Sequence, residues 1–264
     1  MDKSTVSFAK MFKFIVLLSL VASAFSASLS PAIDPEWEGF IVGGSTASAG
    51  QFPHQVSLRS SANAHFCGGF VINNRWVGSA AHCTIGRTNA NTVSVVGTNH
   101  RTSGGIAHST SRIVNHPSYS SATLANDISM VMTASTITFT NLVQPITLGS
   151  ATVGGGVSST ASGWGQTSHP GSAATNLMFL TKPTLTNADC RSRHSAANAA
   201  RVFDNTICTF LRSGAGMCMG DSGGPLIAGG TVIGAVSWGI ACAQGFPDVF
   251  ARISSHRTWM INQM

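Results

Sequence analysis

The sequence predicts an all-β protein built as antiparallel barrels. Apolar residues come in short alternating segments that turn residues separate, and 28 of the 264 residues are glycine. Only 9% of the residues are charged, which argues against both disorder and a coiled coil. Many short strands joined by tight turns at regular spacing are typical of an antiparallel barrel.

The predicted strands form two groups along the chain, which is long enough for one large or two small domains. The first group is 55–58, 69–72, 93–96 and 112–114, and the second is 159–165, 226–228, 232–236 and 249–251. Residues 138–156 are predicted to cross between the groups. After the last strand, Ser254 and Ser255 are expected to cap a helix that carries Trp259, Met260 and Ile261.

The N-terminal segment is predicted to be removed from the mature protein. Three lysines precede an apolar run at 14–21 that is too short to span a bilayer, and small residues follow it. We therefore expect a signal peptide over residues 1–27, cleaved after Ala24 or Ala27, and a secreted, extracellular protein without a membrane anchor. Residues 28–40 are rich in proline and acidic residues, which favours an exposed propeptide.

The six cysteines of a secreted chain indicate disulfides, whose pairing composition leaves open. No Cys-x-x-Cys or paired His/Cys spacing supports a metal site. From Ile41 onward twelve Lys and Arg residues face five Asp residues. This excess predicts either a solvated basic surface or steering of acidic substrates or matrix. No basic run interleaved with aromatic residues suggests nucleic-acid binding.

Three motifs carry a candidate catalytic site. The run Gly220-Asp221-Ser222-Gly223-Gly224 sets a serine in a glycine-rich turn, where backbone N–H groups can approach a reacting carbonyl. Ala80-Ala81-His82-Cys83 supplies a base, and Asn126-Asp127-Ile128 supplies a carboxylate that enters an apolar stretch. A serine hydroxyl is a useful nucleophile only when a base takes its proton and donors stabilise the resulting oxyanion.

With His82, Asp127 and Ser222 in this order, the chain resembles the chymotrypsin-type serine endopeptidases from Ile41 to about Met264. The resemblance implies two six-stranded antiparallel β-barrels with the active site between them, at about 41–145 and 146–250, and a C-terminal helix at about 254–264. It implies a monomeric, digestive endopeptidase that cleaves protein or peptide substrates through an acyl-enzyme. Protein inhibitors are further candidate partners, and no cofactor or metal is expected.

The resemblance also implies a role for each motif residue. His82 would be the general base, Asp127 would orient it, and Ser222 would attack, while the N–H groups of Gly220 and Ser222 bind the oxyanion. Cleavage between Phe40 and Ile41 would release an amino group that pairs with Asp221, as an activation switch. Phe40 departs from the Arg or Lys of trypsin-activated relatives. The implied disulfides are Cys67–Cys83, Cys190–Cys208 and Cys218–Cys242.

The specificity pocket departs from the trypsin pattern. Gly216, six residues before Ser222, stands where trypsins carry an Asp, and Asp248 stands where the family usually has glycine. Ser237-Trp238-Gly239 would line one wall and pair with the substrate backbone. A buried carboxylate such as Asp248 needs water, a proton or a substrate cation.

A glycine floor with an aspartate wall resembles the arthropod brachyurin-like collagenolytic proteases. We therefore expect a broad chymotrypsin-like preference, with Arg and Lys tolerated. The alternatives are trypsin-like or collagenolytic specificity, or a catalytically silent binding homologue, which would usually lack a member of the triad.

Overall fold

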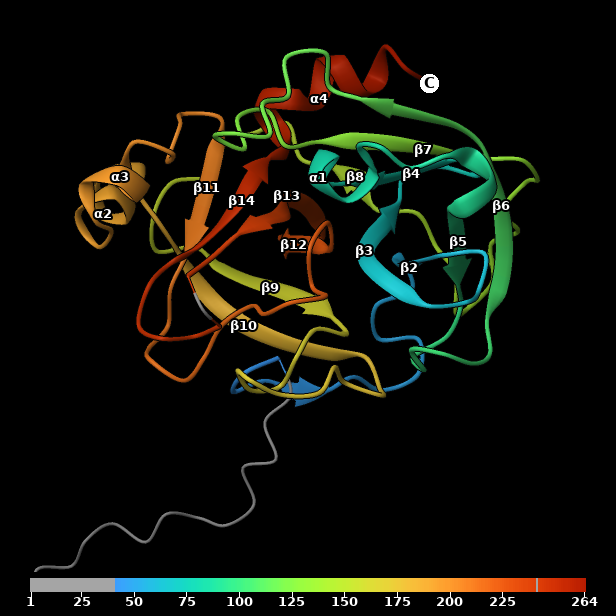
Figure 1. The fold of residues 1–264 in the computed structure, drawn as a ribbon, viewed down its shortest axis with the longest axis horizontal. Helices are drawn as coiled ribbons and strands as arrows, with labels where there is room; N and C mark the ends of the chain where they lie inside the picture. Colours follow the sequence, from blue (N-terminus) through green and yellow to red (C-terminus); the bar gives the residue numbers. More distant parts are fainter. Residues whose placement is uncertain (1–40, 241) are drawn as a thin grey trace, which may run out of the picture. The chain divides into compact units, whose positions relative to one another are not determined.

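The computed structural model describes residues 41–264 apart from residue 241. The predicted signal peptide and propeptide, including Phe40, lie outside the described residues. The strands form two closed six-stranded antiparallel barrels, which Figure 1 shows beside each other. The predicted all-β class and its two barrels are therefore confirmed.

The first barrel has the strand order β2-β3-β4-β7-β6-β5 and closes where β5 pairs with β2. Its inner residues Val56, Leu58, Val77 and Val131 are fully buried in one apolar cluster. The sequence groups missed β4 and β7, which are short and lack a marked alternation. The strands are β2 (Gln55–Arg59), β3 (His65–Val71), β4 (Trp76–Ser79), β5 (Val93–Val96), β6 (Ile106–Asn115) and β7 (Ser129–Thr133).

The second barrel runs β9-β10-β11-β14-β13-β12 and closes where β9 pairs with β10. Two short strands join it from outside: β1 (Ser45–Thr46) pairs with β10, and β8 (Thr147–Leu148) lies parallel to β13. The barrel strands are β9 (Ser158–Gly163), β10 (Met178–Leu185), β11 (Thr206–Thr209), β12 (Pro225–Ala228), β13 (Thr231–Trp238) and β14 (Asp248–Arg252). The first described strand, β1, therefore pairs with the second barrel, and the strands of the first barrel follow it in the sequence.

The helices are short and lie between or after strands. They are α1 (Ala81–Thr84), α2 (Asn187–Ser192), α3 (Ala196–Ala199), α4 (Ile253–Ile261) and the 3₁₀ helix η1 (Asn89–Asn91). The prediction that Ser254 and Ser255 cap the last helix is wrong. Because β14 continues directly into α4, both serines already lie in its first turn, and the N-cap is Arg252 without a side-chain hydrogen bond.

Helix α4 belongs to the core that the two barrels share. Its Ile253 and Met260 are fully buried with Phe70 and Met130 of the first barrel and Val232 of the second. In the part of the chain that the structure describes, no helix has the length and apolarity needed to cross a bilayer.

The Ser222 turn contacts the first barrel directly. The Gly68 N–H of β3 donates to the Ser222 carbonyl at 2.7 Å. Gly223 has φ +75°, and a Cβ there would lie 2.2 Å from Ser79 Oγ of β4. This contact leaves no room for a side chain, so the glycine holds the turn against the first barrel.

Replacing Gly223 with alanine should therefore destabilise the protein by roughly 2–4 kcal/mol, through backbone strain and overpacking together. Gly230 has the same φ of +75° but no atom within 4 Å of its Cβ position, so Gly230→Ala is a matched control for the strain. It should cost about 1–2 kcal/mol. Denaturant unfolding of both variants measures the difference, and equal losses would show that the contact with Ser79 is unimportant.

Candidate active site

His82 and Asp127 are joined by two hydrogen bonds. His82 lies in α1, which begins after β4, and Asp127 lies just before β7, the strand beside β4. The His82 Nδ1–H donates to Asp127 Oδ2 at 2.7 Å, and the His82 backbone N–H donates to Oδ1 at 2.8 Å. Asp127 is 1% exposed, so the imidazole is held at two points by a carboxylate that water does not reach.

Ser237 ties this pair to the second barrel. Its hydroxyl, on β13, donates to Asp127 Oδ2 at 2.6 Å. Sequence analysis assigned Ser237 to the wall of the substrate pocket and missed this bond. Nothing in the local sequence around Ser237 indicates a hydrogen-bond partner that lies 110 residues away. With three donors, the buried carboxylate is satisfied as an anion.

Ser222 and His82 line the same cleft, which has a volume of about 460 Å³. Of the predicted pocket residues, Ser237, Trp238, Gly239 and Asp248 line it as well. The remaining lining residues, which the sequence did not single out as a group, are His169, Met217, Cys218, Met219, Val236 and Cys242. The cleft thus combines a serine and an imidazole with a largely apolar wall.

The backbone around Ser222 leaves two N–H groups for a ligand. Asp221, Gly223 and Gly224 donate their N–H groups to protein carbonyls. Among the described residues, no hydrogen bond uses the N–H of Gly220 or of Ser222. Gly220 has φ +102°. Two unused N–H groups beside a serine are suited to binding a developing oxyanion.

His65 holds the carbonyl of the same turn. Its Nε2–H donates to the Gly220 carbonyl at 3.0 Å, while Nδ1 accepts the Ser57 hydroxyl at 2.8 Å. The pKa of His65 is lowered to about 4, chiefly by burial; the Gly220 bond opposes this shift, and the nearby Arg101 and Arg59 add to it. The ring is therefore neutral, with the tautomer that both bonds require.

Asp221 is fully buried. Its carboxylate accepts the Gly165 N–H at 2.8 Å and the Cys218 N–H at 2.9 Å. Burial nevertheless raises the pKa of Asp221 to about 7. Ile41 is fully buried in the core of the second barrel, and the next residue, Val42, pairs with Gly216. A cation near Asp221 would stabilise its anionic form.

Asp248 has a partner that the sequence did not predict. We expected water, a proton or a substrate cation, but the Lys182 ammonium donates to Asp248 Oδ2. The Met217 N–H donates to the same oxygen at 3.1 Å. Gly216 lies against this carboxylate, because a Cβ at Gly216 would be 3.1 Å from Oδ2. The charge of the pocket residue is thus balanced inside the protein.

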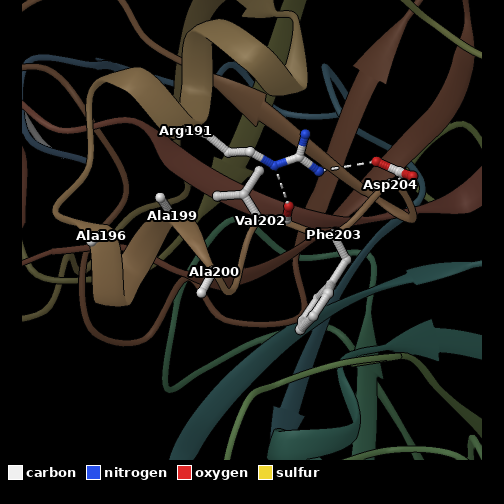
Figure 2. A pocket seen from close by; sticks show the side chains of 7 residues that line it. All are labelled: Arg191, Ala196, Ala199, Ala200, Val202, Phe203 and Asp204. Atoms are coloured by element: carbon white, nitrogen blue, oxygen red, sulfur yellow. Dashed lines mark hydrogen bonds and ion pairs between the residues drawn. The ribbon is translucent and has the colours of Figure 1, made fainter.

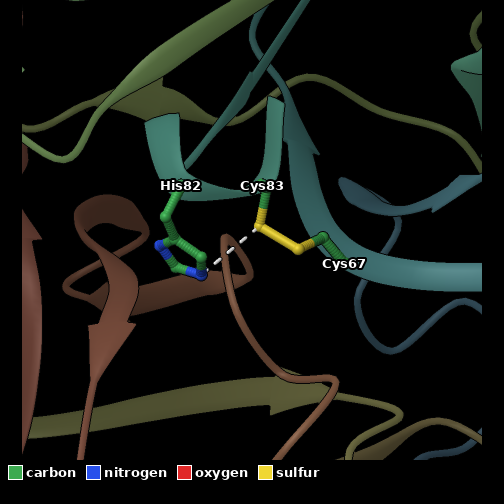
Figure 3. Close-up of side chains that lie close together, drawn as sticks. All are labelled: Cys67, His82 and Cys83. Carbon is green, nitrogen blue, oxygen red and sulfur yellow. Dashed lines mark hydrogen bonds between the residues drawn. A yellow bond between two sulfur atoms is a disulfide. The ribbon is translucent and has the colours of Figure 1, made fainter. Parts of the chain in front are cut away.

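The structure joins Cys67–Cys83, Cys190–Cys208 and Cys218–Cys242, the pairs that the resemblance implied. Cys67, His82 and Cys83 are the one close group of potential metal ligands within the described residues. Figure 3 shows the two sulfur atoms bonded to each other beside the His82 ring. Neither sulfur is a thiolate, so this group is a disulfide that supports the His82 turn and not a metal centre.

A second hollow, of about 610 Å³, lies at α2 and α3 (Figure 2). Its lining contains Arg191, Asp204, Phe203, Val202 and three alanines, with no nucleophile or imidazole. Arg191 and Asp204 pair at 3.0 Å, with their side chains 41% and 97% exposed. An exposed pair of this kind contributes little energy. Because its lining offers neither a nucleophile nor an imidazole, this hollow is not a candidate for the catalytic site.

Comparison with known proteins gives a consistent family. The family model described as Trypsin matches residues 41–260. Trypsin beta of Drosophila erecta is 35% identical over 96% of this chain and 99% of its own length. Trypsin alpha-4 of Lucilia cuprina is 34% identical over 96% of this chain and 98% of its own length.

The neutral state of His65 predicts a pH-dependent stability. Its folded pKa of about 4 lies below the ordinary 6.5, so the unfolded chain binds more protons between these values. Stability is complete above about pH 6.5 and falls as the pH drops to 4, by roughly 3 kcal/mol for this group. The glutamine in His65→Gln cannot titrate. Denaturant unfolding of this variant should therefore show a loss of stability between pH 6.5 and 4 that is smaller than that of the wild type by roughly 3 kcal/mol. An unchanged pH profile would contradict a buried, neutral His65.

Proposed function

Because this chain belongs to the trypsin family and is a serine endopeptidase, we propose that Ser222, His82 and Asp127 are its catalytic triad. The bonds from His82 to Asp127, with the ring and Ser222 in one cleft, are the observation that carries this proposal. Protein substrates follow from the family.

The proposed reaction proceeds through an acyl-enzyme. With Nδ1–H bonded to Asp127, His82 presents Nε2 as the base that takes the Ser222 proton. The serine oxygen then attacks the peptide carbonyl, and the imidazolium returns the proton to the leaving amine. Asp127 stabilises the imidazolium because its buried charge is fixed before the proton moves. The oxyanion would be bound by the N–H groups of Gly220 and Ser222, which have no partner among the described residues.

Activation is proposed to depend on Asp221. Cleavage between Phe40 and Ile41 would release an ammonium group at a residue that is already buried in the second barrel. Pairing with this ammonium would offset the burial that raises the pKa of Asp221, and would order the loop that carries Gly220 and Ser222. Phe40 points to an activating protease that accepts aromatic residues, and this enzyme itself is one candidate.

The substrate preference is proposed to be chymotrypsin-like and broad. Met217, Val236 and Trp238, with the Cys218–Cys242 disulfide, give the cleft apolar walls that suit a large apolar or aromatic side chain. Gly216 lacks the carboxylate that would select Arg or Lys. Tolerance of Arg and Lys, or a trypsin-like or collagenolytic preference, would depend on the free charge of Asp248. We also propose that the enzyme is secreted, because of the predicted signal peptide, and that it is a monomeric digestive enzyme, as the family resemblance implies.

The nucleophile can be identified by covalent labelling. A fluorophosphonate should modify Ser222 of the processed enzyme, and mass spectrometry of the labelled peptide locates the adduct. Ser222→Ala should lose labelling and lower kcat by at least roughly 10⁴-fold, because nucleophile and base act as a unit. Absence of labelling in the processed wild type would favour the silent binding homologue instead.

The activation contact can be tested by Asp221→Asn. The amide has a single acceptor oxygen, so one of the two backbone N–H groups loses its acceptor; the melting temperature should fall by a few degrees while the protein still folds. The specificity constant kcat/KM should fall on the order of 10²–10³-fold, because the new ammonium group loses its buried partner. Asp204→Asn, at an aspartate whose side chain is 97% exposed, is the control and should behave as wild type. Wild-type kinetics in Asp221→Asn would refute the switch.

A further inference from the structure

Lys182 is the one lysine between Ile41 and Met264, and it points into the second barrel. Buried and exposed residues alternate along the middle of β10, so Lys182 shares the inner face with Met178, Leu180 and Thr184. Its side chain is fully buried. An ammonium group in such a place is costly unless a counter-charge satisfies it.

That counter-charge is Asp248, the first residue of β14. The ammonium group donates to Oδ2, and the Phe250 ring centroid lies 5.7 Å from Nζ. A compact ammonium suits this position better than a wide guanidinium, because it delivers its charge to a single oxygen. The pair is closed off from solvent, since the Asp248 side chain is only 7% exposed.

Asp248 stands between Lys182 and the substrate cleft. It lines the cleft, whereas Lys182 is not among the lining residues. Its two oxygens lie 3.1 Å from the Cβ positions of Gly216 and Gly239, one oxygen at each. Both glycines belong to the predicted specificity pocket. Of the two, Gly239 lines the cleft and Gly216 does not. The carboxylate therefore forms part of the cleft wall, and the Lys182 ammonium that neutralises it is not exposed to the cleft.

We propose that Lys182 determines substrate specificity by neutralising Asp248, so that the pocket accepts uncharged apolar side chains and discriminates against Arg and Lys. This inference rests on the proposed function of the same cleft. A substrate cation entering the pocket would meet a carboxylate whose charge is already balanced, and would lose its hydration without gaining an ion pair. Lys182 acts through Asp248 and does not contact substrate.

The test compares peptide p-nitroanilides that differ only in the residue before the scissile bond: Phe, Leu, Arg or Glu. Lys182→Met keeps the length of the side chain and removes its charge. It should raise the ratio of kcat/KM for Arg over Phe by at least about 30-fold, because the carboxylate becomes available. In the double variant Lys182→Met/Asp248→Asn, this ratio should return to the wild-type value.

A reciprocal variant keeps the proposal falsifiable if Lys182→Met does not fold. Asp248→Asn leaves the lysine charge unbalanced, so the ratio for Glu over Phe should rise by at least about tenfold. Arg191→Met, which breaks the exposed pair of Figure 2, is the matched control and should keep the wild-type preferences. Unchanged ratios in folded Lys182→Met, or in Asp248→Asn, would overturn the proposal.

Fluorophosphonate titration separates this inference from the proposed function. If the wild type is labelled at Ser222 but the charge variants keep its substrate ratios, the specificity role of Lys182 is wrong and the enzyme mechanism stands. If the processed wild type is neither labelled nor active on any of the four peptides, the proposed function fails first, and the role of Lys182 fails with it.

Discussion

The burial of Asp127 between the two barrels is the constraint on which the rest of the active site depends. A carboxylate at 1% exposure must receive hydrogen bonds, and it receives them from His82 of the first barrel and Ser237 of the second. The imidazole and the strand that borders the substrate cleft are therefore positioned by the same anion. A shift of one barrel against the other would break these bonds before it altered either barrel.

Buried carboxylates concentrate at this site. Asp127, Asp221 and Asp248 are three of the five acidic residues after Ile41, and each is at most 5% exposed. Each is compensated in its own way: Asp127 by hydrogen-bond donors from both barrels, Asp248 by a lysine, and Asp221, among the residues that the structure describes, by two backbone N–H groups. Asp221 is the least compensated, and its raised pKa expresses this deficit. A new N-terminal ammonium is the simplest group that could correct it.

The motifs of the proposed triad, the all-β class and most of the barrel strands could be identified from the sequence because they depend on local signals; β4, β7, β10 and β11 were not identified. His82, Asp127 and Ser222 each stand in a short motif, and most strands carry apolar alternation. The partner of Lys182 was not predictable, since it depends on which inward-facing residues of β10 and β14 meet across the barrel interior. The same holds for Ser237, whose partner lies in the other barrel. The position of Lys182 in a strand of alternating burial indicates that a buried anion lies nearby, but it does not identify that anion.

The charge of the specificity pocket emerges from three positions that constrain each other. A Cβ at Gly216 would lie 3.1 Å from Asp248 Oδ2, so a second carboxylate there would be sterically crowded as well as electrostatically unfavourable. Asp248 in turn requires Lys182, because an unpaired anion at 5% exposure would be unstable. On the proposed role of Lys182, a carboxylate at position 248 in place of one at position 216 would not preserve trypsin-like recognition. The lysine neutralises that carboxylate, so the preference would follow the combined charge of the three residues and not the identity of any one.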